Sequence, residues 1–488
     1  MRYIDLGVIL AYLALITWFG AHFRKGQKNL RDYVLGGRTA PWWAIALSIV
    51  SAETSTLTIV GTPALSFTGN LGFLQVVFGY LLARIVISLI LLPHYFRGEM
   101  FTAYELMRRR FGEPVRGLTA SIFLVTRALA EGVRVFAVSL VVSIVLGTGE
   151  VWSIVLILVL TLVYTFEGGM TAVIWTDVVQ MCLYVVGAVT SFFVILSHIP
   201  GGWGHVLAVA GGAGKFQLLD FHWSAAAPYT FWAGVIGGCF LTMASHGTDQ
   251  LMVQRLLSAR DLRQSRTALL GSWAVIFVQF GLFLLIGVLL FVYYRDRGLR
   301  PPAEMDRIYP EFLWRNLAPG VAGITIAAIL AAAMANLSAA LNSLAATTVV
   351  DFFRSRDRQG AANGNRSLWQ ARAATVAWAG VLLAIGILAR RWGSVLEAGL
   401  TIASIPSGAL LGVFLLGVLT RKPGGRAAVA GVVAGLAGVL YIRFRTPVAF
   451  TWYVVVGACV TFCIGLAASV FERAPQKDIE FASPKRRF

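Results

Sequence analysis

Charged residues are scarce in this chain. Only 13% of its 488 residues are Asp, Glu, Lys or Arg, whereas 58% are hydrophobic. A soluble domain usually has about 25% charged and about 45–50% apolar residues, so this composition excludes an ordinary soluble enzyme. Long polar stretches are lacking as well, because the longest gaps between apolar runs, near 198–227, 295–318 and 351–369, are only loop-sized. The sequence therefore predicts a single polytopic domain embedded in the lipid bilayer.

Cysteine and histidine are also few, with four and six residues. The cysteines fall within apolar runs, where we interpret them as small buried hydrophobic residues rather than as disulfide partners or metal ligands. The histidines lie mostly in loops, and no span has the paired His, Asp or Glu spacing that an intramembrane enzyme needs. We therefore predict no enzymatic activity. The cysteines are Cys182, Cys239, Cys459 and Cys463.

Acidic residues, at 23, are outnumbered by 41 basic residues. In a soluble protein this excess would suggest a nucleic-acid partner, but here the basic residues stand in short gaps between apolar runs, which is the positive-inside pattern. The basic gaps near 24–38, 97–110 and 255–266 face the cytoplasm if the N-terminus lies outside. We predict a protein of the cell (inner, cytoplasmic) membrane with its N-terminus outside and its C-terminus in the cytoplasm, with no nucleic-acid partner and no obligate protein partner.

The apolar runs predict about thirteen transmembrane helices, since each needs about 20 apolar residues to cross a bilayer. The first run, residues 6–19, is followed by Arg24 and Lys25 rather than by a small-residue cleavage site, so we interpret it as a retained helix. The predicted spans lie near 4–22, 42–67, 71–96, 115–146, 150–167, 171–197, 228–252, 265–294, 319–350, 370–391, 394–419, 426–443 and 449–471.

Polar residues interrupt the second and the seventh of these spans. A continuous lipid-facing helix cannot hold them, because unpaired polar and backbone groups in hydrocarbon cost several kcal/mol each. They indicate broken helices around a wet cavity, and broken helices at corresponding positions are typical of transporters built from inverted repeats. We therefore predict an all-α fold with two inverted five-helix repeats whose first helices are broken. The candidate cavity residues on these spans are Ser51, Glu53, Thr54, Thr242, Ser245, His246 and Asp249.

The corresponding division of the single transporter domain follows from the spans. An extra helix and loop occupy 1–40, the first repeat 41–197, the second repeat 228–420, and two extra helices with a cytoplasmic tail 421–488.

The fourth predicted span has Arg127, Glu131 and Arg134 on about one helical face. Charge inside a membrane is costly, so we expect Arg127 and Glu131 to neutralise each other. Arg134 could bind a substrate carboxylate with its guanidinium, or pair with Glu131 or Glu53 and hold the bundle together. Glu53 itself would be stabilised by a helix N-terminus or an arginine. His246 is either a hydrogen-bond partner in the pore or a buried histidine bonded to a carbonyl.

Four local motifs occur in order along the chain at the boundaries of the predicted spans: Arg31-Asp-Tyr-Val-Leu-Gly-Gly-Arg-Thr-Ala-Pro-Trp-Trp, Glu167-Gly-Gly-Met-Thr-Ala-Val-Ile-Trp-Thr-Asp-Val-Val-Gln, Asp249-Gln-Leu-Met-Val-Gln-Arg and Ala331-Ala-Ala-Met-Ala-Asn-Leu-Ser-Ala-Ala-Leu-Asn-Ser. Together they resemble the sodium:solute symporter family. The resemblance runs from about residue 31 to 420. It implies a leucine-transporter-type fold and a sodium-coupled symporter that imports a small polar organic solute by alternating access, with Na+ as the coupling ion. A proton-coupled symporter of the same fold, or a transporter-like sensor or channel, is the alternative.

The resemblance also implies a sodium site between the broken first core helix and the eighth core helix. It assigns the backbone carbonyls of Leu47 and Val50, and those of Ala332 and Ala335, to the ion, which prefers oxygen ligands. Where relatives commonly have paired hydroxyls, this chain has Ala335 followed by Asn336. We expect the amide oxygen of Asn336 to be the side-chain ligand. The alternative is a small residue plus an amide that permit close helix packing.

A second cation site is implied only in part. In some relatives the aspartate of the Trp-Thr-Asp motif, here Asp177, joins hydroxyls of the eighth core helix around an additional cation. This chain has Ser338 at that place but Ala339 next to it, so the second site would lack one ligand. Asp177 could instead serve a helix end or a gate. An arginine in the region of Arg134 binds the substrate in sialic-acid-transporting relatives.

Overall fold

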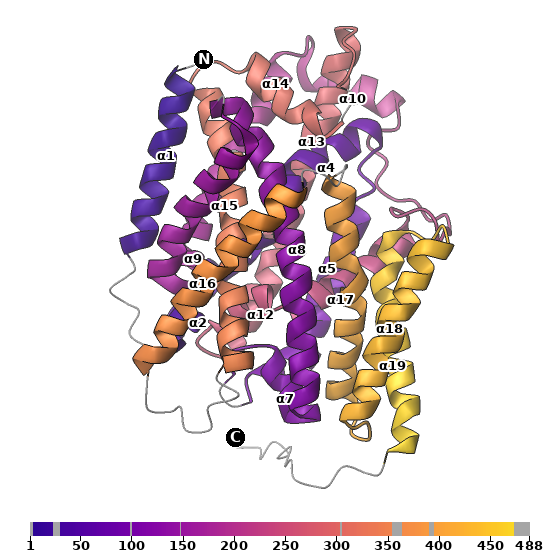
Figure 1. Cartoon of the computed structure of the whole chain (residues 1–488). Helices are drawn as coiled ribbons and strands as arrows, with labels where there is room; N and C mark the ends of the chain where they lie inside the picture. The colour runs from indigo at the N-terminus through magenta and orange to yellow at the C-terminus, as the bar shows by residue number, and fades with distance from the viewer. Residues whose placement is uncertain are drawn as a thin grey trace.

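A computed structural model describes residues 3–22, 30–97, 100–146, 148–302, 305–353, 364–389 and 395–472 (Figure 1). Every regular element in these ranges is a helix, which confirms the predicted all-α fold. Eight helices are long and apolar enough to cross a membrane, or nine if the bent pair α3 and α4 counts as one span. The count of thirteen spans therefore stays a prediction.

The gaps predicted as loops contain short helices. α10 and α14 lie in the gaps near 198–227 and 295–318, and α7 follows the third predicted span. The helices are α1 (Tyr3–His22), α2 (Leu30–Leu35), α3 (Trp42–Glu53), α4 (Thr56–Thr68), α5 (Leu74–Val86), α6 (Leu92–Tyr95), α7 (Tyr104–Phe111), α8 (Glu113–Leu146), α9 (Glu150–Ser197), α10 (Gly202–Gly212), α11 (Gly238–Gly247), α12 (Gln250–Leu257), α13 (Leu262–Asp296), α14 (Ile308–Asn316), α15 (Val321–Thr347), α16 (Gly364–Ala389), α17 (Val395–Leu419), α18 (Gly425–Arg445) and α19 (Tyr453–Ala468), with π-helical turns at Ile87–Leu91, Ala233–Gly237 and Thr348–Phe353.

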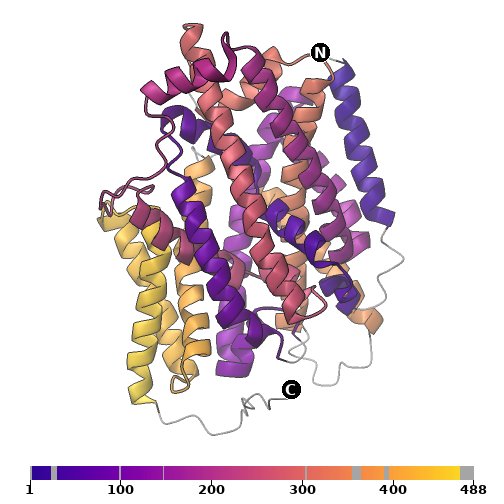
Figure 2. The same cartoon turned by 180° about the vertical axis from the view of Figure 1, so that it is seen from behind.

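The helices form one bundle with α15 inside it. In both views α1 lies at one edge and the pair α18 and α19 at the opposite edge (Figures 1 and 2). α1 begins at the end of the bundle opposite to the end at which α19 stops. Nearly every residue of α15 is buried, because its many alanines let α9, α8, α1 and α16 approach closely. The eighth core helix of the sequence prediction is therefore the central helix of the fold.

The first predicted break lies between α3 and α4. Thr54 has an extended backbone, and its hydroxyl donates a hydrogen bond to the Val50 carbonyl at the end of α3. Ser55 then caps α4 by accepting from the Thr58 backbone N–H, with Thr58 bonding in return to the Ser55 N–H. These hydroxyl side chains end one helix and start the next, and the two axes differ by 63°.

The second predicted break lies between α11 and α12. Thr248 leaves the helix, and Asp249 caps α12 by accepting a hydrogen bond from the Leu251 N–H at 2.9 Å. Gly247 packs closely here, since a Cβ at this position would come within 2.5 Å of the Leu91 side chain, which would have to shift. The broken helices predicted from the polar residues are thus confirmed at both places.

A third discontinuity divides α9. Gly169 has φ of 53°, a left-handed conformation that glycine adopts without a steric penalty, and it separates the two spans predicted near 150–167 and 171–197.

The prediction that the cysteines are buried was wrong. Cys182, Cys459 and Cys463 are exposed on the outer surfaces of α9 and α19, and Cys239 is half-buried. In a membrane protein an exposed apolar position faces lipid, so an apolar sequence run alone does not distinguish a lipid contact from a core contact.

Candidate solute cavity and sodium site

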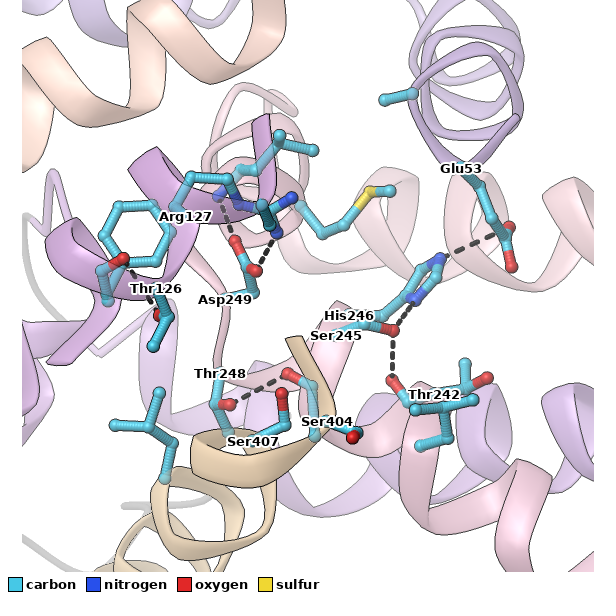
Figure 3. Close-up of a pocket in the computed structure, with 18 of the residues that line it drawn as sticks. Glu53, Thr126, Arg127, Thr242, Ser245, His246, Thr248, Asp249, Ser404 and Ser407 are labelled. Carbon is cyan, nitrogen blue, oxygen red and sulfur yellow. Dashed lines mark hydrogen bonds and ion pairs between the residues drawn. The ribbon is translucent and has the colours of Figure 1, made fainter. Parts of the chain in front are cut away.

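A cavity of about 230 Å³ lies where the two broken helices meet (Figure 3). Its lining comes from α3, α5, α8, α11, α12 and α17, so segments far apart in the sequence build it together. The polar lining residues are Glu53, Tyr80, Thr126, Arg127, Arg134, Thr242, Ser245, His246, Thr248, Asp249, Ser404 and Ser407.

Six of the eight predicted cavity residues line this cavity. Two do not. The Ser51 side chain is buried, and Thr54 is held by the Val50 carbonyl and by the Gln279 amide at 2.6 Å. Both belong to the framework of the break. The six that line the cavity are Glu53, Arg134, Thr242, Ser245, His246 and Asp249.

One wall of the cavity has a chain of ion pairs along α8. Arg127 pairs with Asp249 of α12 and, at 3.0 Å, with Glu131. Arg134 donates from Nη1 to the same oxygen of Glu131 at 2.5 Å. The expected pair of Arg127 and Glu131 is confirmed, and Asp249 adds a second carboxylate that the sequence did not pair with it.

Arg134 has donors that remain available. Its Nη1 also reaches Asn336 Oδ1 of α15 at 3.5 Å, whereas Nε and Nη2 form no hydrogen bond with any residue that the structure describes. The side chain is 27% exposed and lines the cavity. Arg134 therefore has the structural partner Glu131 and, at the same time, donors that no described residue engages.

The opposite wall is formed around Glu53 at the end of α3. Arg84 of α5 donates to Glu53 Oε2 at 2.6 Å, and His246 Nε2 lies 3.4 Å from the same oxygen. His246 Nδ1 is 2.9 Å from the Ser245 hydroxyl, so the histidine bonds side chains and not a carbonyl. Glu53 is stabilised by an arginine, as expected.

The sequence reasoning did not assign Arg84 a role. Its side chain is fully buried, and its Nε donates to the Ser272 hydroxyl of α13 at 3.1 Å. A lone arginine inside an apolar span requires a carboxylate partner, and this requirement is the signal that could have identified it.

The residues that the family resemblance assigns to sodium lie on α3 and α15, two helices that pack against each other. The Val50 carbonyl accepts from the Thr54 N–H and hydroxyl, and the Ala335 carbonyl accepts from Ser338 at 3.0 Å. Asn336 Nδ2 donates to the Thr54 carbonyl at 3.1 Å. The amide of Asn336 therefore sits directly at the break between α3 and α4, with Leu47 and Ala332 on the same two helices.

Asp177 lies in a separate, fully buried cluster. Its Oδ2 accepts from Arg255 Nη2 at 2.7 Å and from Ser48 at 2.5 Å, and Arg255 Nε also donates to Ser48 at 2.8 Å. Its Oδ1 forms no hydrogen bond within the described part of the chain. Ser338, the other residue predicted for a second cation, bonds to the Ala335 carbonyl instead of to Asp177.

The charges around the cavity balance. Arg84, Arg127 and Arg134 stand against Glu53, Glu131 and Asp249. Buried charge at a cavity between two interrupted membrane helices is the arrangement in which secondary transporters bind an ion and a solute together. The fold and the site define a membrane transporter.

The chain belongs to the sodium:solute symporter family, whose model matches residues 33–435. The human sodium/iodide cotransporter is 30% identical over 466 residues, covering 90% of this chain and 69% of that protein. The sodium/sialic acid symporter SiaT of Proteus mirabilis is 27% identical over 98% of this chain and 97% of its own length. A solved structure described as the substrate-bound outward-open state of a Na+-coupled sialic acid symporter matches with a TM-score of 0.89 and 26% identity, over 96% of this chain and 98% of that chain.

These comparisons settle the class of activity. The protein is a sodium-coupled solute symporter of the membrane and not an enzyme, and Na+ is its coupling ion. Its fold is of the leucine-transporter type, with two inverted five-helix repeats.

Proposed function

We propose that the solute is a small organic anion whose carboxylate binds Arg134. The main observation that supports this proposal is that Nε and Nη2 of Arg134 form no hydrogen bond with a described residue, although the side chain lines the cavity. A guanidinium presents donors in a planar fork that fits a carboxylate with two parallel hydrogen bonds. The relatives named for sialic acid and for monocarboxylates are similar to this chain at 27% identity, which supports a carboxylate.

The charge balance supports an anion as well. Since the charged side chains at the cavity cancel, a solute that brings one negative charge together with one Na+ leaves the site neutral. A lone ion of either sign would carry uncompensated charge into a low-dielectric environment, which costs several kcal/mol of desolvation free energy.

A thermal-stability screen tests this proposal. Purified protein is heated with lactate, N-acetylneuraminate, iodide or a neutral sugar, once in sodium and once in choline buffer. We expect a carboxylate to raise the unfolding midpoint only when sodium is present, because ligands that bind the folded state stabilise it. Stabilisation by the sugar or by iodide, with no carboxylate effective, would refute the assignment.

The sodium site of the proposal consists of carbonyls of Leu47, Val50, Ala332 and Ala335 with the amide oxygen of Asn336. Two observations support it: α3 packs against α15, and Asn336 already bonds to the Thr54 carbonyl at the break. The Val50 carbonyl accepts from the Thr54 N–H and hydroxyl, and the Ala335 carbonyl accepts from the Ser338 hydroxyl, so an ion bound there would replace the hydroxyl at each of these carbonyls.

We further propose one coupling sodium per solute. Arg255 supplies the positive charge that a second sodium at Asp177 would supply, and the neighbouring residue on α15 is Ala339, which has no oxygen in its side chain. A second ion would have to use Asp177 Oδ1 beside a guanidinium, and the two cations would repel each other.

The proposed orientation has the N-terminus outside the cytoplasmic membrane. α1 begins and α19 stops at opposite ends of the bundle, and the basic residues 108–110 of α7 lie at the end where α19 stops. The positive-inside rule then favours that end as cytoplasmic. We keep the two repeats at 41–197 and 228–420, flanked by 1–40 and 421–488, because the breaks after α3 and α11 fall in the first helix of each repeat.

A further inference from the structure

Asn336 is in contact with two different parts of the site at once. Its Nδ2 donates to the Thr54 carbonyl at 3.1 Å, and its Oδ1 accepts from Arg134 Nη1 at 3.5 Å. The oxygen and the nitrogen of this amide cannot change places, because the Thr54 carbonyl can only accept a hydrogen bond and the Arg134 guanidinium can only donate one. The amide therefore links the break between α3 and α4 to an arginine of the solute cavity.

A second cavity adjoins this link. It has a volume of about 20 Å³, and Arg134 lines both this cavity and the large one. Its polar lining residues are Ser55, Glu131, Arg134 and Asn336. A water molecule needs about 10–15 Å³ of such space, so the cavity has room for one water-sized particle. The carbonyls of Leu47, Val50, Ala332 and Ala335 are not part of its lining.

Asn336 Oδ1 cannot bind sodium and the guanidinium of Arg134 equally well at the same time. It is the oxygen that we assign to sodium, and it is also the acceptor for Arg134. Two positive charges that share one oxygen lie within a few ångströms of each other, where their repulsion in a protein interior is substantial. Sodium binding should therefore weaken the bond from Arg134 to Asn336, while the bond from Arg134 to Glu131 keeps the guanidinium at the cavity.

We propose that Asn336 is a positioning residue that couples sodium binding to solute binding, an inference that rests on the proposed function. Without sodium its amide oxygen holds Arg134 Nη1. Sodium takes this oxygen and releases the guanidinium toward the large cavity, where the solute carboxylate binds. Sodium then binds before the solute, and the solute in turn raises the affinity for sodium by the same factor.

The test measures sodium binding alone, with no solute present. The half-saturating Na+ concentration of the purified full-length protein is determined from Na+-dependent intrinsic tryptophan fluorescence at constant ionic strength with choline. Arg134→Gln removes the competitor for Asn336, so we expect half-saturation at a Na+ concentration about three- to tenfold lower than in the wild type, because the 3.5 Å bond that it removes is worth about as much as an ordinary hydrogen bond.

A double-mutant cycle separates competition at Asn336 from simple charge removal. Asn336→Ser keeps an oxygen ligand, but its side chain is too short to reach Arg134. In the Asn336→Ser background we expect Arg134→Gln to have no further effect on sodium binding. Arg127→Gln is the matched comparison, since it also removes a positive charge from α8, but from a residue that does not contact Asn336. Its effect on the half-saturating Na+ concentration should be the same in the wild type and in Asn336→Ser.

Each result has one meaning. An Arg134→Gln effect that persists unchanged in Asn336→Ser overturns the coupling role and leaves only long-range repulsion. An unchanged Na+ affinity in Arg134→Gln also overturns it, while a saturable sodium signal in the wild type would still uphold the sodium site. A wild type without any saturable Na+ response would overturn the sodium site itself and the coupling role with it.

Discussion

Two clusters of buried ion pairs lie beside the broken helices, and they differ in their access to the cavity. In the cluster of Asp177 and Arg255 the side chains are 0% and 1% exposed, and Ser48 bonds to both. In the cluster along α8, Arg127, Asp249 and Arg134 are 14%, 19% and 27% exposed and line the cavity. The same residue types are enclosed in one place and accessible in the other.

This difference indicates separate roles. The guanidinium of Arg255 donates to Asp177, Ser48 and the Leu251 carbonyl, so its donors hold α12, α9 and α3 together. Among the described residues, Arg134 makes its hydrogen bonds through Nη1 alone. An enclosed pair stabilises the bundle, whereas an accessible arginine with available donors can bind a solute.

The largest expected effect is on stability, in Asp177→Asn. This change leaves Arg255 buried without its counter-charge, and removing one partner of a buried pair costs about 3–5 kcal/mol. We expect a marked fall in the unfolding midpoint of the purified protein. The unfolding midpoint of the matched variant Asp249→Asn should fall much less, because Arg127 keeps Glu131 as its partner.

A compensating variant isolates the charge effect. Asp177→Leu combined with Arg255→Met replaces the pair with apolar side chains, and such exchanges are often neutral for stability. Recovery of the midpoint in this double variant would attribute the loss to the unpaired charge. If Asp177→Asn were as stable as Asp249→Asn, the distinction between the two clusters would fail.

The next effect is on solute binding, in Arg134→Gln. Hydrogen bonds to charged groups are worth about 1.5–3 kcal/mol, so the affinity for the carboxylate found in the screen should fall about 10- to 100-fold. The midpoint without solute should change little, because Glu131 keeps Arg127. Uptake into sodium-free vesicles placed in sodium buffer and the solute-dependent shift of the midpoint both measure this.

Arg134→Lys is the control for geometry. Lysine keeps the charge but not the planar fork, so we expect an affinity between those of the wild type and Arg134→Gln. Unimpaired carboxylate binding in Arg134→Gln would show that the accessible cluster is structural, like the enclosed one.

The sequence predicted the elements whose cause is local. Thr54, Ser55 and Thr58 end and restart a helix through their own side chains, and Asp249 caps α12, so both breaks could be recognised from neighbouring residues. The pair of Arg127 and Glu131 follows from helical spacing. Partners from other helices could not be derived: Arg84 with Glu53, and Arg255 with Asp177, meet only through tertiary packing.

A third prediction concerns the coupling ion. Asn336→Ala removes the proposed side-chain ligand of sodium, so the Na+ concentration for half-maximal uptake should rise about tenfold, with little change in the unfolding midpoint. Uptake at varied Na+ in choline-balanced buffer measures it. If Asn336→Ala left the sodium dependence intact while Asp177→Asn abolished uptake in folded protein, the functional cation would belong to the enclosed cluster.

The smallest expected effect is in Ser338→Ala. If Arg255 supplies the positive charge at Asp177, no second sodium needs the Ser338 hydroxyl, which bonds to the Ala335 carbonyl within its own helix. Half-saturation by sodium should then change by less than about twofold, since an intrahelical bond of this type is worth little. The dependence of uptake on Na+ should keep a Hill coefficient of about one, as a single bound ion requires. A coefficient near two in the wild type that falls to one in Ser338→Ala would place a sodium ion beside Asp177, and the enclosed cluster would then take part in transport.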